Sequence, residues 1–246
     1  MESMRLSNDE RRRFIKGFYG SKEFINGESR YCIWVADEDV AKANEIRPIR
    51  ERIDKVRASR LQSKDAHARG MAARPHQFKT PRLADRNVII TPRVSSENRP
   101  YLPVGYLNNS AVIGDRNFAL YDAPLWNMAL IASRLHWVWI GTVCVRMRTD
   151  FSYSNTRGWN TFPLPPLTET NKAELTRCAE EILLAREAHF PATIAELYDP
   201  AKMPENLRAA HDRNDETLER IYIGRRFKND TERLEKLFEL HTKMTQ

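Results

Sequence analysis

Polar and basic side chains gather between residues 93 and 110, and their types suit contact with the edges of nucleic-acid bases. Arginine can donate to both major-groove acceptors of guanine, asparagine can pair with adenine, and glutamate can accept from the amino group of cytosine. The sequence therefore predicts base contacts from a basic stretch and a later turn, namely Arg93, Ser95, Ser96, Glu97, Asn98, Arg99, Asn108, Asn109 and Ser110. Within this set, Ser95 and Ser96 either touch DNA or only shape the loop that presents their neighbours.

A second group of side chains suits phosphate oxygens, which orient a protein on a duplex without specifying its sequence. Lysine and arginine recur ahead of the basic stretch, and hydroxyl groups occur well beyond it. We predict phosphate contacts from Arg57, Arg60, Lys64, Lys79, Arg82, Ser152, Tyr153 and Ser154. For any one of these positions, an ordinary polar loop residue or a solvated helix face is the simpler interpretation.

The distribution of charge also suits a polyanionic partner. The chain has 246 residues and a net charge of +7, from 40 Lys and Arg against 33 Asp and Glu. Residues 41–100 hold 15 Lys and Arg against 6 Asp and Glu, a balance of +9, so the rest of the chain sums to −2. A basic segment on a nearly neutral protein favours nucleic acid. A salt-bridged, solvated helix face is the alternative explanation.

The sequence contains no motif for catalysis or for a cofactor. It lacks a P-loop, a GxGxxG turn, a GxSxG elbow and an HExxH pair, and its six histidines are scattered. An Asn-Pro-Pro-aromatic motif, which would hold a flipped base, is also missing, because the single Pro-Pro pair follows Leu164. We therefore predict no catalytic, cofactor-binding or metal-binding residue on this chain.

The cysteines and the clustered acidic residues do not indicate a metal site either. The three cysteines, at positions 32, 144 and 178, lie far apart and form no CxxC spacing, so we interpret them as buried thiols in a reducing compartment. Asp212, Asp215 and Glu216 are interleaved with Arg213. A solvated helix face explains them better than the metal site of a nuclease.

Hydrophobic periodicity and turn signals predict the elements that position these residues. In chain order they are a helix over 9–16 capped by Ser7 or Asn8, a strand over 29–35, helices over 38–73, strands over 87–91, 101–107 and 117–121 with a turn at 108–110, a helix over 124–148, a loop over 149–167, and helices from 168 onward. The expected fold class is α+β, with a small mixed β segment flanked by helices and followed by a helical C-terminal domain.

The most apolar run, residues 126–145, is long enough to span a bilayer. Arg134 and His136 lie in its middle, and a charge at the centre of a membrane span is costly. We therefore predict a buried core helix and no membrane partner. The tryptophans of this run are expected in the core rather than on the surface, at Trp126, Trp137 and Trp139.

Five stretches occur in the order found in one enzyme family. Residues 93–107 (RVSSENRPYLPVGYL) resemble the target-recognition region of MmeI-like type IIL restriction–modification enzymes and related adenine-N6 DNA methyltransferases. The other four stretches are 18–35 (FYGSKEFINGESRYCIWV), 53–61 (IDKVRASRL), 133–139 (SRLHWVW) and 150–163 (DFSYSNTRGWNTFP). The resemblance extends from about residue 14 to residue 245.

The resemblance implies a domain organisation. Residues 1–36 would be a linker, with one strand, from a missing methyltransferase domain. Residues 37–165 would be a DNA target-recognition domain, and residues 166–246 a C-terminal helical domain. The implied parent is a site-specific DNA (adenine-N6) methyltransferase that uses S-adenosylmethionine. A fused nuclease, with Mg²⁺, is a further option for that parent, whereas this chain would carry no cofactor.

The same resemblance implies the partners and one pair of specificity residues. The partners would be double-stranded DNA and the missing N-terminal methyltransferase domain, with no small-molecule substrate, in the cytoplasm of a prokaryote. Glu97 and Arg99 lie where the family carries a specificity-determining pair. The run Met147-Arg148-Thr149-Asp150 departs from the family, which has a more basic run before the aspartate, so a phosphate contact there is in doubt.

Two other functions remain open at this point. The helical tail, residues 168–246, could dock a partner, which would make the chain an assembly module of a larger complex without base-specific readout. A stand-alone enzyme is the weakest hypothesis, because no nucleophile, metal cluster or cofactor loop can be named.

Overall fold

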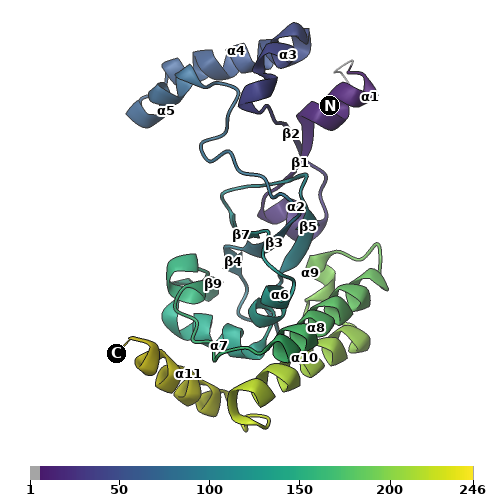
Figure 1. Ribbon diagram of the computed structural model, residues 1–246, viewed down its shortest axis with the longest axis vertical. Helices are drawn as coiled ribbons and strands as arrows, with labels where there is room; N and C mark the ends of the chain where they lie inside the picture. Colours follow the sequence, from purple (N-terminus) through teal and green to yellow (C-terminus); the bar gives the residue numbers. More distant parts are fainter. Residues whose placement is uncertain (1–5, 246) are drawn as a thin grey trace. The chain divides into compact units, whose positions relative to one another are not determined.

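The computed structural model describes residues 6–245, and the chain divides into two compact units. The N-terminal unit comprises Met1–Phe18, Ser29–Leu83 and Ser110–Val112, and the C-terminal unit comprises Tyr19–Glu28, Ala84–Asn109 and Ile113–Gln246. Both units combine helices with short strands (Figure 1), so the fold class is α+β, as expected. Each unit packs its own hydrophobic core.

The first helix of the N-terminal unit, α1 (Asn8–Phe14), begins at a closed capping box. The Ser7 hydroxyl accepts from the backbone N–H of Glu10 at 3.2 Å, and the Glu10 carboxylate accepts from the N–H of Ser7 at 2.8 Å. These two bonds satisfy donors that the first helical turn leaves free. The prediction of a Ser7 cap is confirmed, but the helix ends before the expected Lys16.

A small sheet follows, with strand order β2-β1-β6. Strand β1 (Ile15–Tyr19) pairs antiparallel with β2 (Tyr31–Ile33), and β6 (Ala111–Ile113) lies on the other side of β1. The sequence indicated one longer strand over 29–35 and missed β1 and β6. Strand β1 was missed because Gly17 interrupts its pattern.

The N-terminal unit continues with helices after β2. They are η1 (Asp37–Asp39), α3 (Val40–Glu45), α4 (Arg47–Leu61), α5 (Ala66–Gly70) and η2 (Met71–Ala73). Residues of α3 and α4 pack with Phe14 and Val35 in a compact core. Pro48 occupies the first turn of α4, where its missing N–H costs no helical bond. Helical spacing predicted a buried stripe of Ile49, Ile53 and Val56; the two isoleucines are buried, but Val56 is 38% exposed. The charged residues of α4 are consequently left on its exposed face.

A three-stranded antiparallel sheet forms the centre of the β part of the C-terminal unit. Strand β3 (Asn87–Pro92) lies between β5 (Gly105–Asn108) and β7 (Asn117–Tyr121). All three strands were predicted, although β5 starts four residues later than the expected 101. The turn that follows β5 is also confirmed.

A second sheet of this unit has strand order β4-β9-β8. Strand β9 (Asp150–Ser152) pairs antiparallel with β4 (Val94–Ser95) and with β8 (Arg146–Met147). A five-residue π-helix, η3 (Asn155–Trp159), comes shortly after β9. The prediction of a loop over 149–167 was therefore wrong in its first half. Three-residue strands and single helical turns are too short to produce a periodic pattern.

The apolar run forms two helices instead of the predicted single helix over 124–148. These are α6 (Trp126–Ile131) and α7 (Arg134–Val143). Ser133 separates them, because its backbone is extended (φ −83°, ψ 157°) and its hydroxyl accepts from the N–H of His136. Hydrophobicity conceals this break, since both helices are buried and only the capping serine marks the boundary.

The remaining helices are α2 (Ser21–Asn26), α8 (Glu169–Glu187), α9 (Ile194–Leu197), α10 (Glu205–Ile223) and α11 (Asp230–Thr245). Helices α8 and α10 lie side by side (Figure 1). The core of the unit joins residues from the β part and the tail, including Leu102, Leu175 and Leu218. Trp137 and Trp139 are buried in this core, as predicted, and Trp126 is partly buried and packs against it. No helix within residues 6–245 is long and apolar enough to cross a membrane.

Candidate nucleic-acid interface

The second sheet of the C-terminal unit gathers polar residues that lie far apart in sequence. Val94 pairs with Ser152, and the N–H of Tyr153 donates to the carbonyl of Arg93 at 2.8 Å. This pairing places Arg93 beside the turn that follows β9. The result is a hollow of about 290 Å³, which we call the basic hollow, lined by Arg93, Phe118, Val145, Ser152, Tyr153, Ser154, Asn155 and Arg157.

Two arginines give the basic hollow its charge. Arg93 and Arg157 are both exposed, and neither guanidinium has a carboxylate partner in the described part of the chain. Each therefore keeps its donors free for an anion. Ser154 begins η3 by accepting from the N–H of Arg157, so the same cap that starts this turn also positions the second arginine.

Tyr153 differs from its predicted neighbours because its side chain turns inward. It is 4% exposed, and its hydroxyl lies 3.1 Å from Nε2 of His136. Burial lowers the pKa of His136 to about 3, so this histidine is neutral. Tyr153 thus forms the inner wall of the basic hollow, while Ser152 and Ser154 lie nearer its opening.

The turn that follows β4 carries the residues predicted to read bases, and we call residues 96–99 the recognition turn. A backbone hydrogen bond closes this turn, in which the N–H of Arg99 donates to the carbonyl of Ser96. The Ser96 hydroxyl accepts from the N–H of Asn98, whose own side chain is exposed. Ser95, in contrast, is only 3% exposed, and its hydroxyl finds no partner among the described residues. Ser96 therefore shapes the turn, and Asn98 projects from it.

Both members of the Glu97–Arg99 pair interact with the neighbouring β8–β9 hairpin. Glu97 accepts from Arg146 at 2.5 Å, and the Arg146 guanidinium also lies over the ring of Phe151. Burial lowers the pKa of Arg99, while Asp150 acts in the opposite direction. The sequence did not single out Arg146, because only the pairing of β8 with β9 brings it to the recognition turn.

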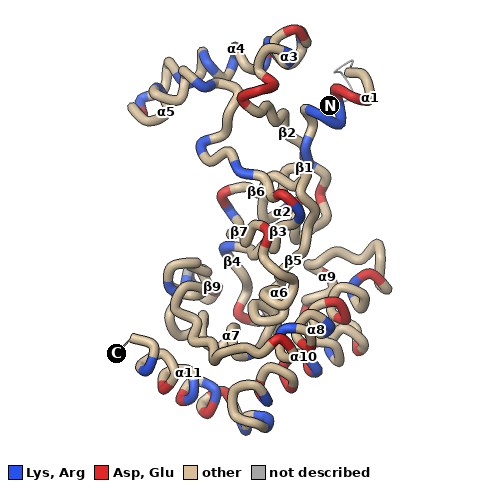
Figure 2. Tube along the Cα trace, viewed as in Figure 1, with Lys and Arg blue, Asp and Glu red and all other residues tan. Residues whose placement is uncertain are grey.

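The predicted phosphate contacts of the N-terminal unit lie on and after α4, where Lys and Arg recur (Figure 2). Arg57, Lys64 and Lys79 are exposed, as is Arg82. Arg60 is committed elsewhere, because its guanidinium donates to the carbonyls of Met71, Arg74 and Gln77 at 2.9, 2.7 and 2.6 Å. Arg60 therefore holds the segment that follows α5, and we do not propose it as a phosphate contact.

Asn108 and Asn109 lie away from the basic hollow, and Ser110 belongs to the N-terminal unit. Asn108 pairs with Asn87 at the first residue of β3, whereas Arg93 follows the last residue of that strand. Six strand residues correspond to about 20 Å. Asn109 donates its side-chain amide to the carbonyl of Asp85 at 3.0 Å, which fixes the turn. The structure thus brings Arg93, Ser152 and Ser154 together but leaves Asn108 and Asn109 at the opposite end of β3.

Metal-ligating side chains do not cluster within residues 6–245. The three cysteines are free, and Cys144 and Cys178 are buried, whereas Cys32 is partly exposed. Burial raises the pKa of Cys32 to about 11. The prediction of a solvated acidic face on α10 was wrong for Asp215, which is 5% exposed and accepts from the backbone N–H of Arg134 at 2.7 Å.

Comparison with known proteins identifies the family. Residues 1–166 match the family described as the MmeI target recognition domain, and residues 167–246 match the MmeI C-terminal domain. The chain belongs to the MmeI family. The resemblance in the five ordered stretches is thereby confirmed over the whole sequence.

Two relatives of this MmeI-type chain are informative. It is 37% identical over 233 residues to DNA methyltransferase A of Bacillus subtilis (strain 168), which covers 95% of this chain and 26% of that protein. A solved structure of the type IIL restriction–modification enzyme MmeI in complex with DNA superimposes with a TM-score of 0.88 at 29% identity. That match covers 96% of this chain and 32% of MmeI. The chain therefore spans about a quarter to a third of the length of these relatives.

Proposed function

We propose that this chain recognises a specific sequence in double-stranded DNA, as the non-catalytic C-terminal portion of an adenine-N6 methyltransferase of the restriction–modification type. The observation that supports this most directly is the likeness, over 96% of the chain, to an enzyme whose structure was solved with DNA. The basic hollow provides a local reason, because two exposed arginines at one opening suit the phosphates of a duplex.

The geometry suggests a division of roles between neighbouring surfaces. Arg93 and Arg157 would hold the phosphate backbone, which fixes the register of the protein on the duplex. The recognition turn would then present Asn98, Glu97 and Arg99 to base edges, with Arg146 beside Glu97. A glutamate already paired with arginine presents both an acceptor and donors to a base pair, so the two side chains would act as one unit.

S-adenosylmethionine would be bound by the parent enzyme and not by the residues of this chain. The sequence contains no GxGxxG turn for a cofactor and no Asn-Pro-Pro-aromatic motif for a flipped base. Methyl transfer would therefore depend on a separate methyltransferase domain, which we propose as the protein partner of this chain.

The phosphate contacts can be tested by duplex binding at increasing salt. We expect Arg93→Ala and Arg157→Ala each to weaken binding to all sequences alike, because phosphates carry no sequence information. Each variant should also reduce the slope of log affinity against log salt by about 0.9. Arg177→Ala is the matched control, since Arg177 is exposed on α8, away from the hollow. Affinities and slopes equal to those of this control would remove the basic hollow from the interface.

Base readout requires a separate measurement. Arg99→Ala should relax the preference at one position of the bound site by about 1–3 kcal/mol, because one good side-chain contact discriminates by that amount. Selection from a randomised duplex pool, followed by sequencing, measures this preference across all candidate sites at once. If the unmodified chain enriches no sequence, direct readout by this portion is excluded.

A further inference from the structure

The segment that leaves the recognition turn is fixed to the helices of the tail. The ring of Tyr101 stacks on the imidazole of His211, with centroids 4.1 Å apart and planes inclined by 16°. His211 lies on α10 and is fully buried. A stacked aromatic pair contributes beyond the area that it buries and restricts the orientation of both rings.

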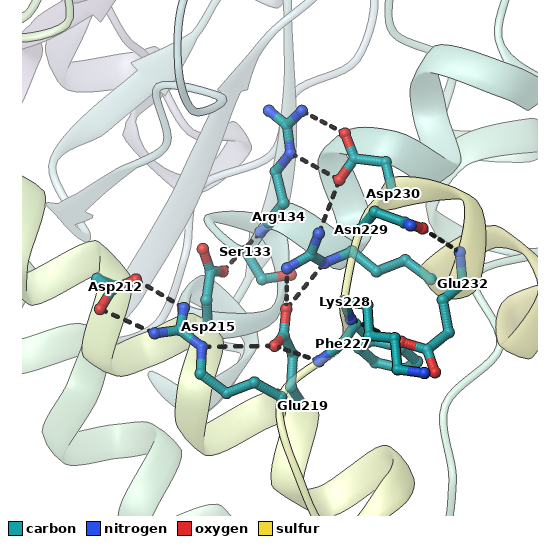
Figure 3. Close-up of polar contacts among 12 residues, drawn as sticks. Ser133, Arg134, Asp212, Asp215, Glu219, Phe227, Lys228, Asn229, Asp230 and Glu232 are labelled. Carbon is teal, nitrogen blue, oxygen red and sulfur yellow. Dashed lines mark hydrogen bonds and ion pairs between the residues drawn. The ribbon is translucent and has the colours of Figure 1, made fainter.

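A carboxylate lies near the other end of the Tyr101 side chain. Tyr101 and Asp215 line the same hollow, together with Arg134. Burial, and next the charge of Asp215, raise the pKa of the Tyr101 hydroxyl. Asp215 follows His211 by one helical turn, so both residues share a face of α10. Figure 3 shows the Asp215 carboxylate next to the backbone of Arg134, whose N–H donates to it at 2.7 Å. The ring of Tyr101 is thus held by stacking on His211, and its hydroxyl faces Asp215 of the same helix.

Helix α8 secures the same segment three residues later. Arg186, which is buried, donates to the carbonyl of Val104 at 2.6 Å. The same guanidinium donates to the hydroxyl of Tyr198 at 2.9 Å, and that hydroxyl lies 2.7 Å from Nε2 of His211. The contacts of Tyr101 and of Val104 therefore end in one buried polar network.

We propose that Tyr101 is a positioning residue through which α8 and α10 hold the recognition turn in the orientation that reads bases. This inference rests on the proposed function, since it assigns a role to residues behind the same surface. The C-terminal helices would then contribute to sequence specificity without touching a base.

The covalent chain explains how the position of Tyr101 reaches Arg99. Only Pro100 separates them, and its ring fixes φ at about −65°. On its other side Arg99 is bound to Ser96 through the backbone, so both ends of the turn are restrained. Recognition geometry must be held to about half an ångström by the residues behind it. Loss of the Tyr101 hydroxyl would therefore reduce the preference for one DNA sequence more than it reduces the total affinity for DNA.

The surroundings of Asp215 add a pH signature. Tyr101 faces Asp215 from the segment after the recognition turn, Arg134 from α7 and Arg233 from α11. Two further charged groups also act on Asp215, namely Glu219 on α10 and Arg226, which follows α10. Burial raises the pKa of Asp215 to about 7. An ionised carboxylate accepts a hydroxyl hydrogen bond more strongly than a neutral one. Sequence preference should therefore sharpen as the pH rises through the pKa of Asp215.

The test measures which sequences the full chain enriches from a randomised duplex pool, and its total affinity for that pool. Both are measured at about one pH unit below and one above the pKa of Asp215. Tyr101→Phe keeps the ring and removes the hydroxyl. It should lower enrichment at the higher pH about fivefold, the effect expected for the loss of one polar contact, with total affinity unchanged. Asp215→Asn should remove the pH dependence of enrichment. Tyr222→Phe is the control, because the buried hydroxyl of Tyr222 on α10 donates instead to the carbonyl of Pro163.

The outcomes separate this inference from the proposed function. If the unmodified chain enriches a sequence but Tyr101→Phe behaves like Tyr222→Phe, the positioning role is overturned and the proposed function stands. Enrichment by the unmodified chain that is identical at the two pH values overturns the role of Asp215. If the unmodified chain binds DNA without enrichment, the proposed function fails, and the positioning role fails with it.

Discussion

Gly105, the first residue of β5, illustrates how closely single residues approach one another in the C-terminal unit. A Cβ atom at this position would lie 2.8 Å from Cζ of Phe24 and 2.9 Å from Cγ2 of Ile90. Both neighbours are buried, so neither can move without disturbing the core. Glycine is required here by close approach and not by backbone conformation.

Gly105→Ala should lower the free energy of unfolding by about 1–3 kcal/mol, because overpacking a dense core forces side chains and backbone to shift. Gly70→Ala is the contrasting variant. Gly70 lies at the end of α5 with helical backbone angles, and a Cβ there meets nothing within 4 Å. Alanine should stabilise this position by about 0.5–1 kcal/mol. Chemical denaturation of both variants measures the difference, and equal effects would contradict the packing argument.

Among the secondary-structure elements, the boundary between α6 and α7 depends on one buried hydroxyl. Ser133 is 1% exposed, donates to the carbonyl of Leu130 at 2.7 Å and accepts from the N–H of His136 at 3.1 Å. The Ser133 hydroxyl thus pairs with a free carbonyl at the end of α6 and with a free N–H at the start of α7. The change of direction sets the faces that α7 presents to β9 and to α11.

Ser133→Ala should destabilise the C-terminal unit by about 1–2 kcal/mol, since it removes an N-cap and leaves a buried N–H unpaired. Thr142→Ala tests the same loss of a hydroxyl on the exposed face of α7, where Thr142 bonds the carbonyl of Val138. The free energy of unfolding of that variant should stay within about 0.5 kcal/mol of the value for the unmodified protein. Thermal and chemical unfolding compare the two, and a Ser133 effect no larger than that of Thr142 would contradict the capping role.

Across the C-terminal unit as a whole, a charged cluster joins α7, α10 and α11 (Figure 3). Glu219 is fully buried and accepts from Arg233 at 2.5 Å and from the backbone N–H of Phe227 at 3.0 Å. Arg134 and Asp230 form a bidentate pair nearby. Asp215 is the exception in this cluster, because burial outweighs its hydrogen bonds and raises its pKa.

This raised pKa makes folding take up a proton. The pKa of Asp215 is about 7 in the folded state, against an ordinary value of 3.8 for an exposed aspartate. The stability that Asp215 contributes is full below the ordinary pKa and is lost as the pH rises through the folded one. Between the ordinary and the folded pKa of Asp215, the free energy of unfolding of Asp215→Asn should therefore rise by roughly 4 kcal/mol relative to that of the unmodified protein. Urea unfolding followed by tryptophan fluorescence measures this, and a constant difference between the two proteins would show that Asp215 does not titrate.

Local patterns were sufficient for the elements that carry a strong signal. The buried stripe of α4, the strands β3 and β7 and the long helices of the tail follow from periodicity. The basic stretch at Arg93 was also visible, because residue type alone suggests base and phosphate contact. Short elements such as β8, β9 and η3 were not predictable, since their two to five residues contain too few repeats for a pattern to be recognised.

Residue types and the order of motifs along the chain were enough to identify the family and the α+β class, and they predict the region of recognition. Which predicted residues act together depended on the folded arrangement. Strand pairing brings Ser152 and Ser154 to Arg93 and adds Arg157, while it places Asn109 about 20 Å away along β3. Burial turned Asp215 from a surface charge into a support for Tyr101. Register and burial depend on contacts between distant parts of the chain, and a local pattern contains no record of them.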